Sequence, residues 1–70
     1  MSSPILGCDV RAALRGVGDG AAAERLGALL GDDEAVGSYE DLTRRCPPEA
    51  LGITPGAHAA ALAPLFGEFE

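Results

Sequence analysis

The segment Gly16–Gly31, GVGDGAAAERLGALLG, shows how this 70-residue chain is organised. Its first five residues include three glycines, which cannot continue a helix cheaply because each costs roughly 1 kcal/mol relative to alanine. Ala21–Leu30 then places apolar side chains on one helical stripe, with Asp19 near its N-terminal end and Gly31 as a natural stop. We therefore expect short helices separated by tight, glycine-containing turns.

On the N-terminal side, Asp9–Arg15 carries apolar side chains at helical spacing, and Asp9 is placed to cap that helix. Residues 1–8 show no comparable pattern. We therefore expect a flexible lead over 1–8 and a single domain over 9–70, because a chain of this length has material for only one small core.

On the C-terminal side, Ser38 is expected to open a third helix, with Asp41 three residues later in an arrangement that resembles a capping box. Two prolines follow Cys46, and a residue before proline is pushed out of the helical region, so this helix should end there. Pro48–Leu51 is expected to form at most one helical turn.

A last helix is expected to begin at Pro55, with Thr54 as its cap, and to extend as far as Phe69. Pro64 lies inside this range and lacks the N–H that a helix interior needs, so it should kink or end the helix. We find no alternating run rich in β-branched residues and therefore expect no sheet. The expected fold is all-α, a compact bundle of five helices.

The charge balance disfavours nucleic acids and anionic membrane surfaces as partners. The net charge is −6, and the five basic residues, all arginines, face eleven acids. Affinity for DNA or RNA comes largely from lysine and arginine on phosphate, so a chain of this charge is repelled. No apolar run reaches the length of a membrane span, and we see no signal peptide, so we expect an intracellular protein, cytoplasmic or nuclear.

The acidic residues are partly clustered in the middle of the chain. Asp32, Asp33 and Glu34 are consecutive, and Glu40 and Asp41 follow a few residues later. Such a run is either a solvated loop and helix face that keeps a small domain soluble, or an acidic docking face for a basic partner. The sequence leaves both interpretations open.

A catalytic or metal centre is not expected. Only 4% of the residues are aromatic, and alanine is abundant, which favours close helix packing over a deep pocket. Cys8 and Cys46 lie far apart in the sequence and belong to no CxxC pair, so we expect two reduced thiols, buried or half-buried. His58 has no His or Cys cluster around it, so we expect neither a metal nor another cofactor.

Two segments, Asp9–Gly18 (DVRAALRGVG) and Leu51–His58 (LGITPGAH), resemble the first helix and the closing segment of the sterile alpha motif (SAM) family. Ala13 stands where that family normally has an aromatic residue, and Ala57 is inserted between the glycine and the histidine. The resemblance spans most of the chain and implies a SAM-like five-helix bundle.

The resemblance also implies a non-enzymatic interaction or oligomerisation module, in which a mid-loop surface of one domain binds an end-helix surface of another. The partner would be a second copy of the chain or another small helical domain with a basic surface. The residues expected to contact it are Asp32, Asp33, Glu34, Glu40, Asp41, Ile53, Thr54, Gly56 and His58. Acidification should protonate His58, whose usual pKa is about 6.5, and strengthen its contacts with acids, unless it is a helix residue without a role.

A second resemblance is to the tandem helix-hairpin-helix domains of DNA repair proteins, and rests mainly on Leu14–Gly18 followed by Ala22. It implies contact with a DNA backbone through the amides of Gly16, Val17 and Gly18, or heterodimerisation in a nucleic-acid-processing protein. An acid, Asp19, follows this turn directly and would repel a phosphate. The sequence therefore favours protein interaction over DNA contact.

Overall fold

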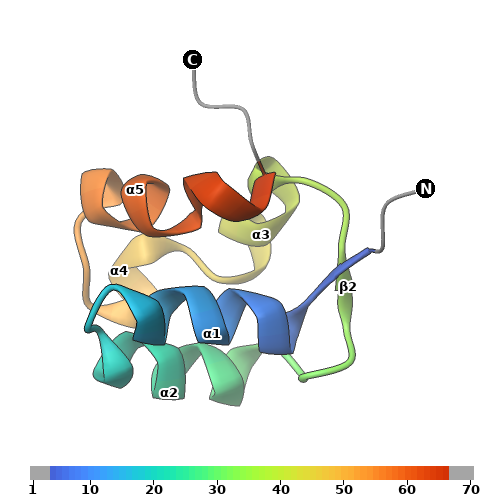
Figure 1. Ribbon diagram of the computed structural model, residues 1–70, viewed down its shortest axis with the longest axis horizontal. Coiled ribbons are helices and arrows are strands. Elements are labelled where there is room, and N and C mark those ends of the chain that lie inside the picture. Colours follow the sequence, from blue (N-terminus) through green and yellow to red (C-terminus); the bar gives the residue numbers. More distant parts are fainter. Residues whose placement is uncertain (1–3, 67–70) are drawn as a thin grey trace.

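The computed structural model describes residues 4–66, which form five helices and two short strands (Figure 1). The elements in chain order are β1 (Ile5–Leu6), α1 (Gly7–Gly16), α2 (Gly20–Leu29), β2 (Ala35–Val36), α3 (Tyr39–Arg45), α4 (Pro48–Leu51) and α5 (Pro55–Phe66). The mostly helical architecture with five helices is as expected from the sequence.

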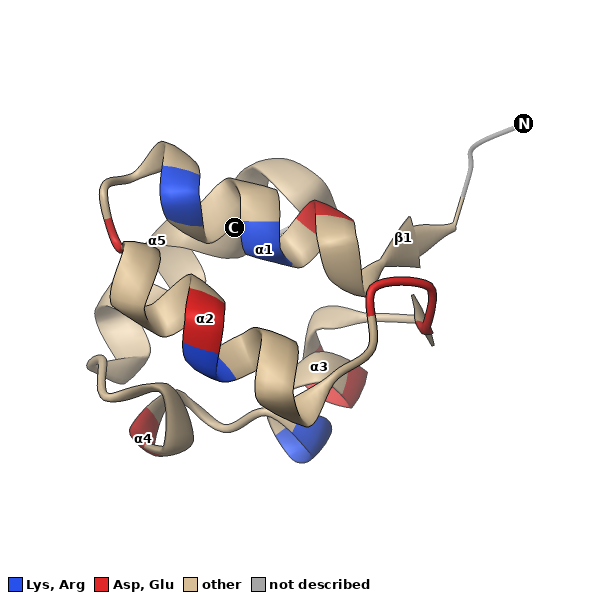
Figure 2. Cartoon of the chain, turned by 90° about the horizontal axis from the view of Figure 1, so that it is seen from below, with Lys and Arg blue, Asp and Glu red and all other residues tan. Residues whose placement is uncertain are grey.

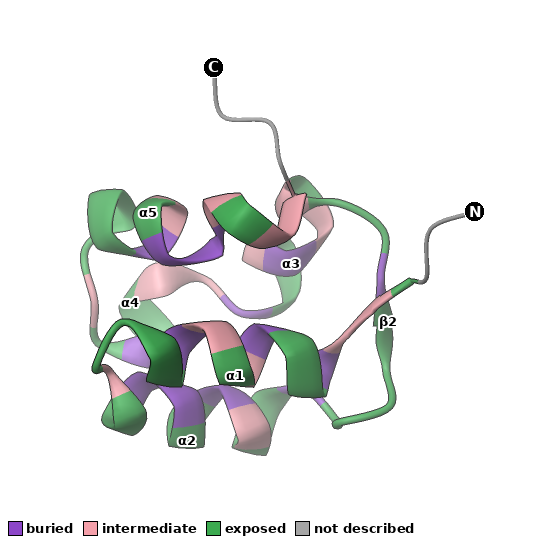
Figure 3. Cartoon of the chain, viewed as in Figure 1, coloured by how far each residue is buried: buried purple, intermediate pink, exposed green. Residues whose placement is uncertain are grey.

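Helix α1 lies at the centre, between α2 on one side and α5 on the other (Figure 1). The short helix α4 contacts both α2 and α5 and so closes the core at the back. The buried faces of the helices turn toward this shared interior (Figure 3). The core consists of Val10, Leu14, Ala22, Ala23, Leu26, Leu30, Val36, Leu42, Cys46, Leu51, Ala61 and Leu62.

The expectation that the chain contains no sheet is wrong. Strands β1 and β2 pair antiparallel, with Ile5 opposite Val36 and Leu6 opposite Ala35. Each strand has two residues, which is too short for an alternating pattern to show in the sequence. Residues 5–8, expected within the flexible lead, instead form β1 and the first residues of α1.

The polar residues expected at helix N-termini do occupy those positions. Each accepts a hydrogen bond from the amide three residues later: Asp19 from Ala22 (3.3 Å), Ser38 from Asp41 (3.1 Å) and Thr54 from Ala57 (3.1 Å). Asp9 differs, because α1 begins two residues earlier than expected and Asp9 falls in its first turn. There its carboxylate accepts from the Leu6 amide at 3.0 Å and still stabilises the helix start.

Helix α5 continues through Pro64 to Phe66, so the proline does not end it. The missing N–H of Pro64 removes one hydrogen bond of the helix, and only two further helical residues follow it. The extension expected as far as Phe69 lies outside the described residues. Within residues 4–66, no helix combines the length and the apolar character needed to cross a membrane.

The start of α1 is held against the loop that follows α2. The amide of Gly7 donates to the Glu34 carbonyl and that of Cys8 to the Asp32 carbonyl, both at 3.0 Å. A Cβ atom on Gly7 would collide with the carbonyl of Gly31. Glycine is therefore required at position 7 by a close backbone approach.

We predict that Gly7→Ala lowers the free energy of unfolding by about 2 kcal/mol, because the added methyl forces the two backbone segments apart. Gly20→Ala is the matched control, since nothing lies within 4 Å of a Cβ at that position. It should leave stability unchanged or raise it by up to about 1 kcal/mol. Urea denaturation followed by circular dichroism measures both, and equal effects of the two substitutions would contradict the prediction.

Candidate functional site

The acidic segment 32–34 lies beside the start of α1, at the end of the molecule that holds the two strands (Figure 2). The carboxylate of Asp32 forms an ion pair with Arg11 at 2.8 Å. The Arg11 side chain passes next to Gly27 of α2 on its way to Asp32. A Cβ atom added to Gly27 would lie 3.1 Å from the Arg11 guanidinium. Negative charge near a helix N-terminus is also favourable to the helix dipole. Asp32 thus stabilises the fold of this chain, through its ion pair with Arg11 and its place near the start of α1.

Arg45, in the last turn of α3, brings the two parts of the acidic cluster together. It pairs with Glu34 at 3.2 Å and with Asp41 at 3.4 Å. The Asp41 carboxylate also accepts from the Gly37 amide at 3.2 Å. Exposed pairs of this kind contribute at most about 1 kcal/mol each, so their main effect here is to neutralise the acids.

Asp33 and Glu40 are the two remaining acids of the expected docking face. Both are exposed, and neither forms an ion pair within the part of the chain that the structure describes. They lie on different segments, the loop before β2 and the first turn of α3. Of the five acids expected to bind a partner, three are already paired with arginines of the same chain.

The expected end-helix surface at the start of α5 is only partly at the surface. Thr54 and Gly56 are exposed and Ile53 is half-buried, so these residues are available to a partner. His58 is not, because its exposed fraction is 0%. The expectation that His58 contacts a partner's acids is therefore wrong, since its ring belongs to the core.

His58 connects α5 to α3. Its Nδ1 atom and the Tyr39 hydroxyl form a hydrogen bond of 2.7 Å, and the two ring centroids lie 5.3 Å apart. The Nε2 atom is buried and has no hydrogen-bond partner among the described residues. Burial lowers the pKa of His58, and the neighbouring backbone of Cys46 offsets this only in part. The ring is therefore neutral at neutral pH.

The two cysteines are unbonded and differ in environment. Cys46 is buried, as expected, whereas Cys8 is exposed. Burial raises the pKa of the Cys46 thiol, so at neutral pH it stays protonated and is a poor nucleophile. Within residues 4–66, no three His, Cys, Asp or Glu side chains are grouped so that they could hold a metal ion.

The glycine turn at 16–18 closes the C-terminal end of α1. Its amides bond back to the helix: Val17 donates to Leu14 (3.3 Å), Gly18 to Arg15 (3.0 Å) and Asp19 to Leu14 (3.0 Å). Gly18 adopts a φ of 85°, a conformation that favours glycine. The amides that a DNA phosphate would need are thus already bonded, and the Asp19 carboxylate occupies the start of α2.

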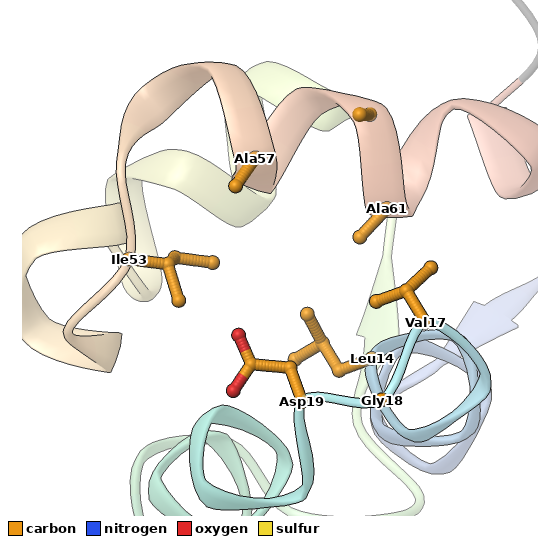
Figure 4. Close-up of a pocket in the computed structure, with 8 residues that line it drawn as sticks. Leu14, Val17, Gly18, Asp19, Ile53, Ala57 and Ala61 are labelled. Atoms are coloured by element: carbon orange, nitrogen blue, oxygen red, sulfur yellow. The ribbon is translucent and has the colours of Figure 1, made fainter.

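A groove that the sequence analysis missed runs between α1 and α5. One part is a hollow of about 340 Å³ at the end of α1. Ala57 and Ala61 point into it from α5, Val17 points toward them from the end of α1, and the Asp19 carboxylate lies between Leu14 and Ile53 (Figure 4). Val17 is 60% exposed, although it is a large apolar residue.

The second part, of about 490 Å³, continues along α1 toward its start. Its α1 side is a stripe at helical spacing, and it shares Val17 and Ala61 with the first part. It is lined by Asp9, Ala12, Ala13, Gly16, Val17, Ala61, Pro64 and Leu65. We call the two parts together the α1–α5 groove.

A signal for this groove is present in the sequence. The segment Pro55–Phe66 contains no lysine, arginine, aspartate or glutamate, although about half of the helix is exposed (Figures 2 and 3). A surface helix normally carries charged residues on its outer face. The lack of them marks α5 as a helix whose outer face is apolar.

Comparison of this chain with protein-family models, with curated proteins and with solved structures found no match.

We predict that His58 makes the stability of the fold depend on pH. The unfolded chain binds a proton at His58 near pH 6.5, whereas burial opposes protonation in the folded chain. The stability that neutral His58 provides is therefore present above about pH 6.5 and is lost as the pH falls below it. In His58→Gln, whose amide can still bond to Tyr39, the free energy of unfolding should depend less on pH.

The measurement is urea denaturation of the wild type and of His58→Gln at about pH 7.5, 6.5 and 5.5. The difference in stability between them should shrink as the pH falls. Tyr39→Phe is the control, because it removes the hydroxyl partner and keeps the titrating ring, so it should retain the pH dependence of the wild type. A difference between wild type and His58→Gln that stays constant over this range would contradict the prediction.

Proposed function

We propose that this chain is a non-enzymatic protein–protein interaction module and that its binding surface is the side of the molecule formed by α5. The observation that carries the proposal is the apolar, charge-free outer face of α5 beside the α1–α5 groove. A helix that is apolar all round is normally buried. Among residues 4–66, the elements that pack on α5 leave one of its sides exposed, and a partner would supply the cover for that side.

The residues on the open side are small, so another backbone could approach closely. The exposed positions of α5 are Pro55, Gly56, Ala57, Ala60 and Pro64. The exposed Val17 lies next to them. A single exposed apolar residue is ordinary on a protein surface, but Val17 and the exposed positions of α5 form a continuous apolar face, which is typical of an interaction site. Exposed Thr54 and Gly56 extend this face to the N-terminal end of α5.

The resemblance to the SAM family supports the same proposal. It implies an end-helix surface at the start of the last helix, which adjoins the α1–α5 groove here. Within the acidic mid-loop surface, Asp33 and Glu40 are the residues we propose as available to a partner, because the other three acids are paired internally. Contact with a DNA backbone has no place in the proposal, since the amides of the glycine turn are bonded within the chain.

A photo-crosslinking experiment tests the proposal. We expect a benzoylphenylalanine introduced in place of Ala60, which is exposed and lines the groove, to form a discrete adduct in cells that express the protein. Ala28 is the matched control position, because it is also an exposed alanine within a helix but lies on α2. Mass spectrometry of the adduct identifies the partner, which is then purified and crosslinked to the chain again.

Adducts of equal yield from the two positions, or none from position 60, would refute a binding surface on α5. A product with twice the mass of the chain from position 60 alone would support the interaction module and identify the partner as a second copy.

A further inference from the structure

Among residues 4–66, the two charged residues that line the α1–α5 groove are both acids. Asp19 lines the part near the end of α1, and Asp9 lines the part near its start. No lysine or arginine lines either part. A binding partner would therefore meet apolar walls with negative charge at each end.

These two carboxylates differ from the acids of the 32–41 region. Asp9 and Asp19 each accept one backbone amide, from Leu6 and Ala22 respectively, and neither takes part in an ion pair within residues 4–66. A carboxylate can accept several hydrogen bonds, so each retains acceptor capacity for an external cation. In the first part of the groove, the Asp19 carboxylate lies among the apolar side chains (Figure 4).

The spacing of the two acids suggests the shape of the occupant. Asp9 lies in the first turn of α1 and Asp19 follows the turn that closes this ten-residue helix, so their separation is close to the helix length, on the order of 15 Å or about three helical turns. Between them the walls are mainly alanine and glycine, which allow a helix to approach closely. An α-helix laid along the groove would place side chains three turns apart next to the two carboxylates.

We infer that the α1–α5 groove binds an amphipathic basic helix of a partner protein, with an apolar stripe flanked by two arginines or lysines about three turns apart. This inference rests on the proposed function and specifies the partner. Apolar side chains of that helix fill the hollows beside Val17 and Ala61, and its cations pair with Asp9 and Asp19.

A second copy of the chain does not fit this description. The chain has no lysine, and its arginines are Arg11, Arg15, Arg25, Arg44 and Arg45. No helix within residues 4–66 carries two of them three turns apart. Two copies, each with a net charge of −6, also repel one another. The charges therefore favour a basic partner of different sequence.

The test uses a synthetic helical peptide of about 15 residues, with arginines about eleven residues apart and leucines between them at spacings of three and four on the same face. The rest of the peptide is alanine and glutamine. Binding at low salt is measured by fluorescence anisotropy, and amide chemical shifts locate the binding site. We expect shifts at Val17, Ala57 and Ala61, and an affinity that falls as salt is added.

Asp9→Asn with Asp19→Asn should weaken binding of this peptide about tenfold. Asparagine keeps the oxygen that accepts the helix-capping amides, so the fold is retained. Glu24→Gln with Glu49→Gln is the matched control, because it removes the same charge from exposed acids that lie outside the groove and outside the proposed binding surface. That control should stay within about twofold of the wild type, and circular dichroism verifies that both variants are folded.

Three results would overturn the inference: equal weakening by both double variants, equal binding of a peptide with glutamine in place of arginine, or shifts that map away from the groove. The crosslinking result then separates this inference from the proposed function. If a partner is captured from position 60 but the peptide test fails, the proposed interaction module is supported and only the inference that its partner is a basic helix is refuted. If no specific adduct forms from position 60, the proposed binding surface on α5 is itself refuted.

Discussion

The fold depends on how the first amides of α1 are satisfied. The first amides of any helix have no partner within the helix, and here two of them bond to the carbonyls of Asp32 and Glu34. This contact brings the loop after α2 back across the start of α1, where Gly7 touches Gly31. The short sheet of β1 and β2 forms next to it. The central helix is thereby held at one end, and its sides pack against α2 and α5.

The contact between the start of α1 and the loop after α2 gives the acidic cluster a structural role. In the sequence the cluster stands out as a docking face, but its backbone caps α1 and most of its carboxylates pair with Arg11 and Arg45. Acids that are neutralised within the chain attract a partner weakly. Asp9 and Asp19 are inconspicuous in the sequence, yet they border the apolar groove without an ion pair in the described part of the chain.

Features that depend on residues close together in the sequence were predicted correctly, whereas features that depend on contacts between distant segments were not. Helix caps such as Ser38 and Thr54 act on amides three residues away, so their role was readable from local spacing. His58 was misplaced on the surface because its burial depends on Tyr39, nineteen residues away on another helix. The sheet was missed because a two-residue strand exists only through its pairing with another segment. The absence of charge in α5 is visible in the sequence, but the groove itself arises only where α1 and α5 pack side by side.

The sequence by itself determined that the chain forms short helices separated by glycine and proline turns, where most of those helices begin, and that its charge disfavours phosphate ligands. These properties depend on local backbone preferences and on composition. Only the tertiary structure decided which acids are paired, that His58 is buried, and that α1 and α5 leave a groove between them. Those outcomes depend on contacts between segments distant in the sequence, whose geometry arises only when the helices pack.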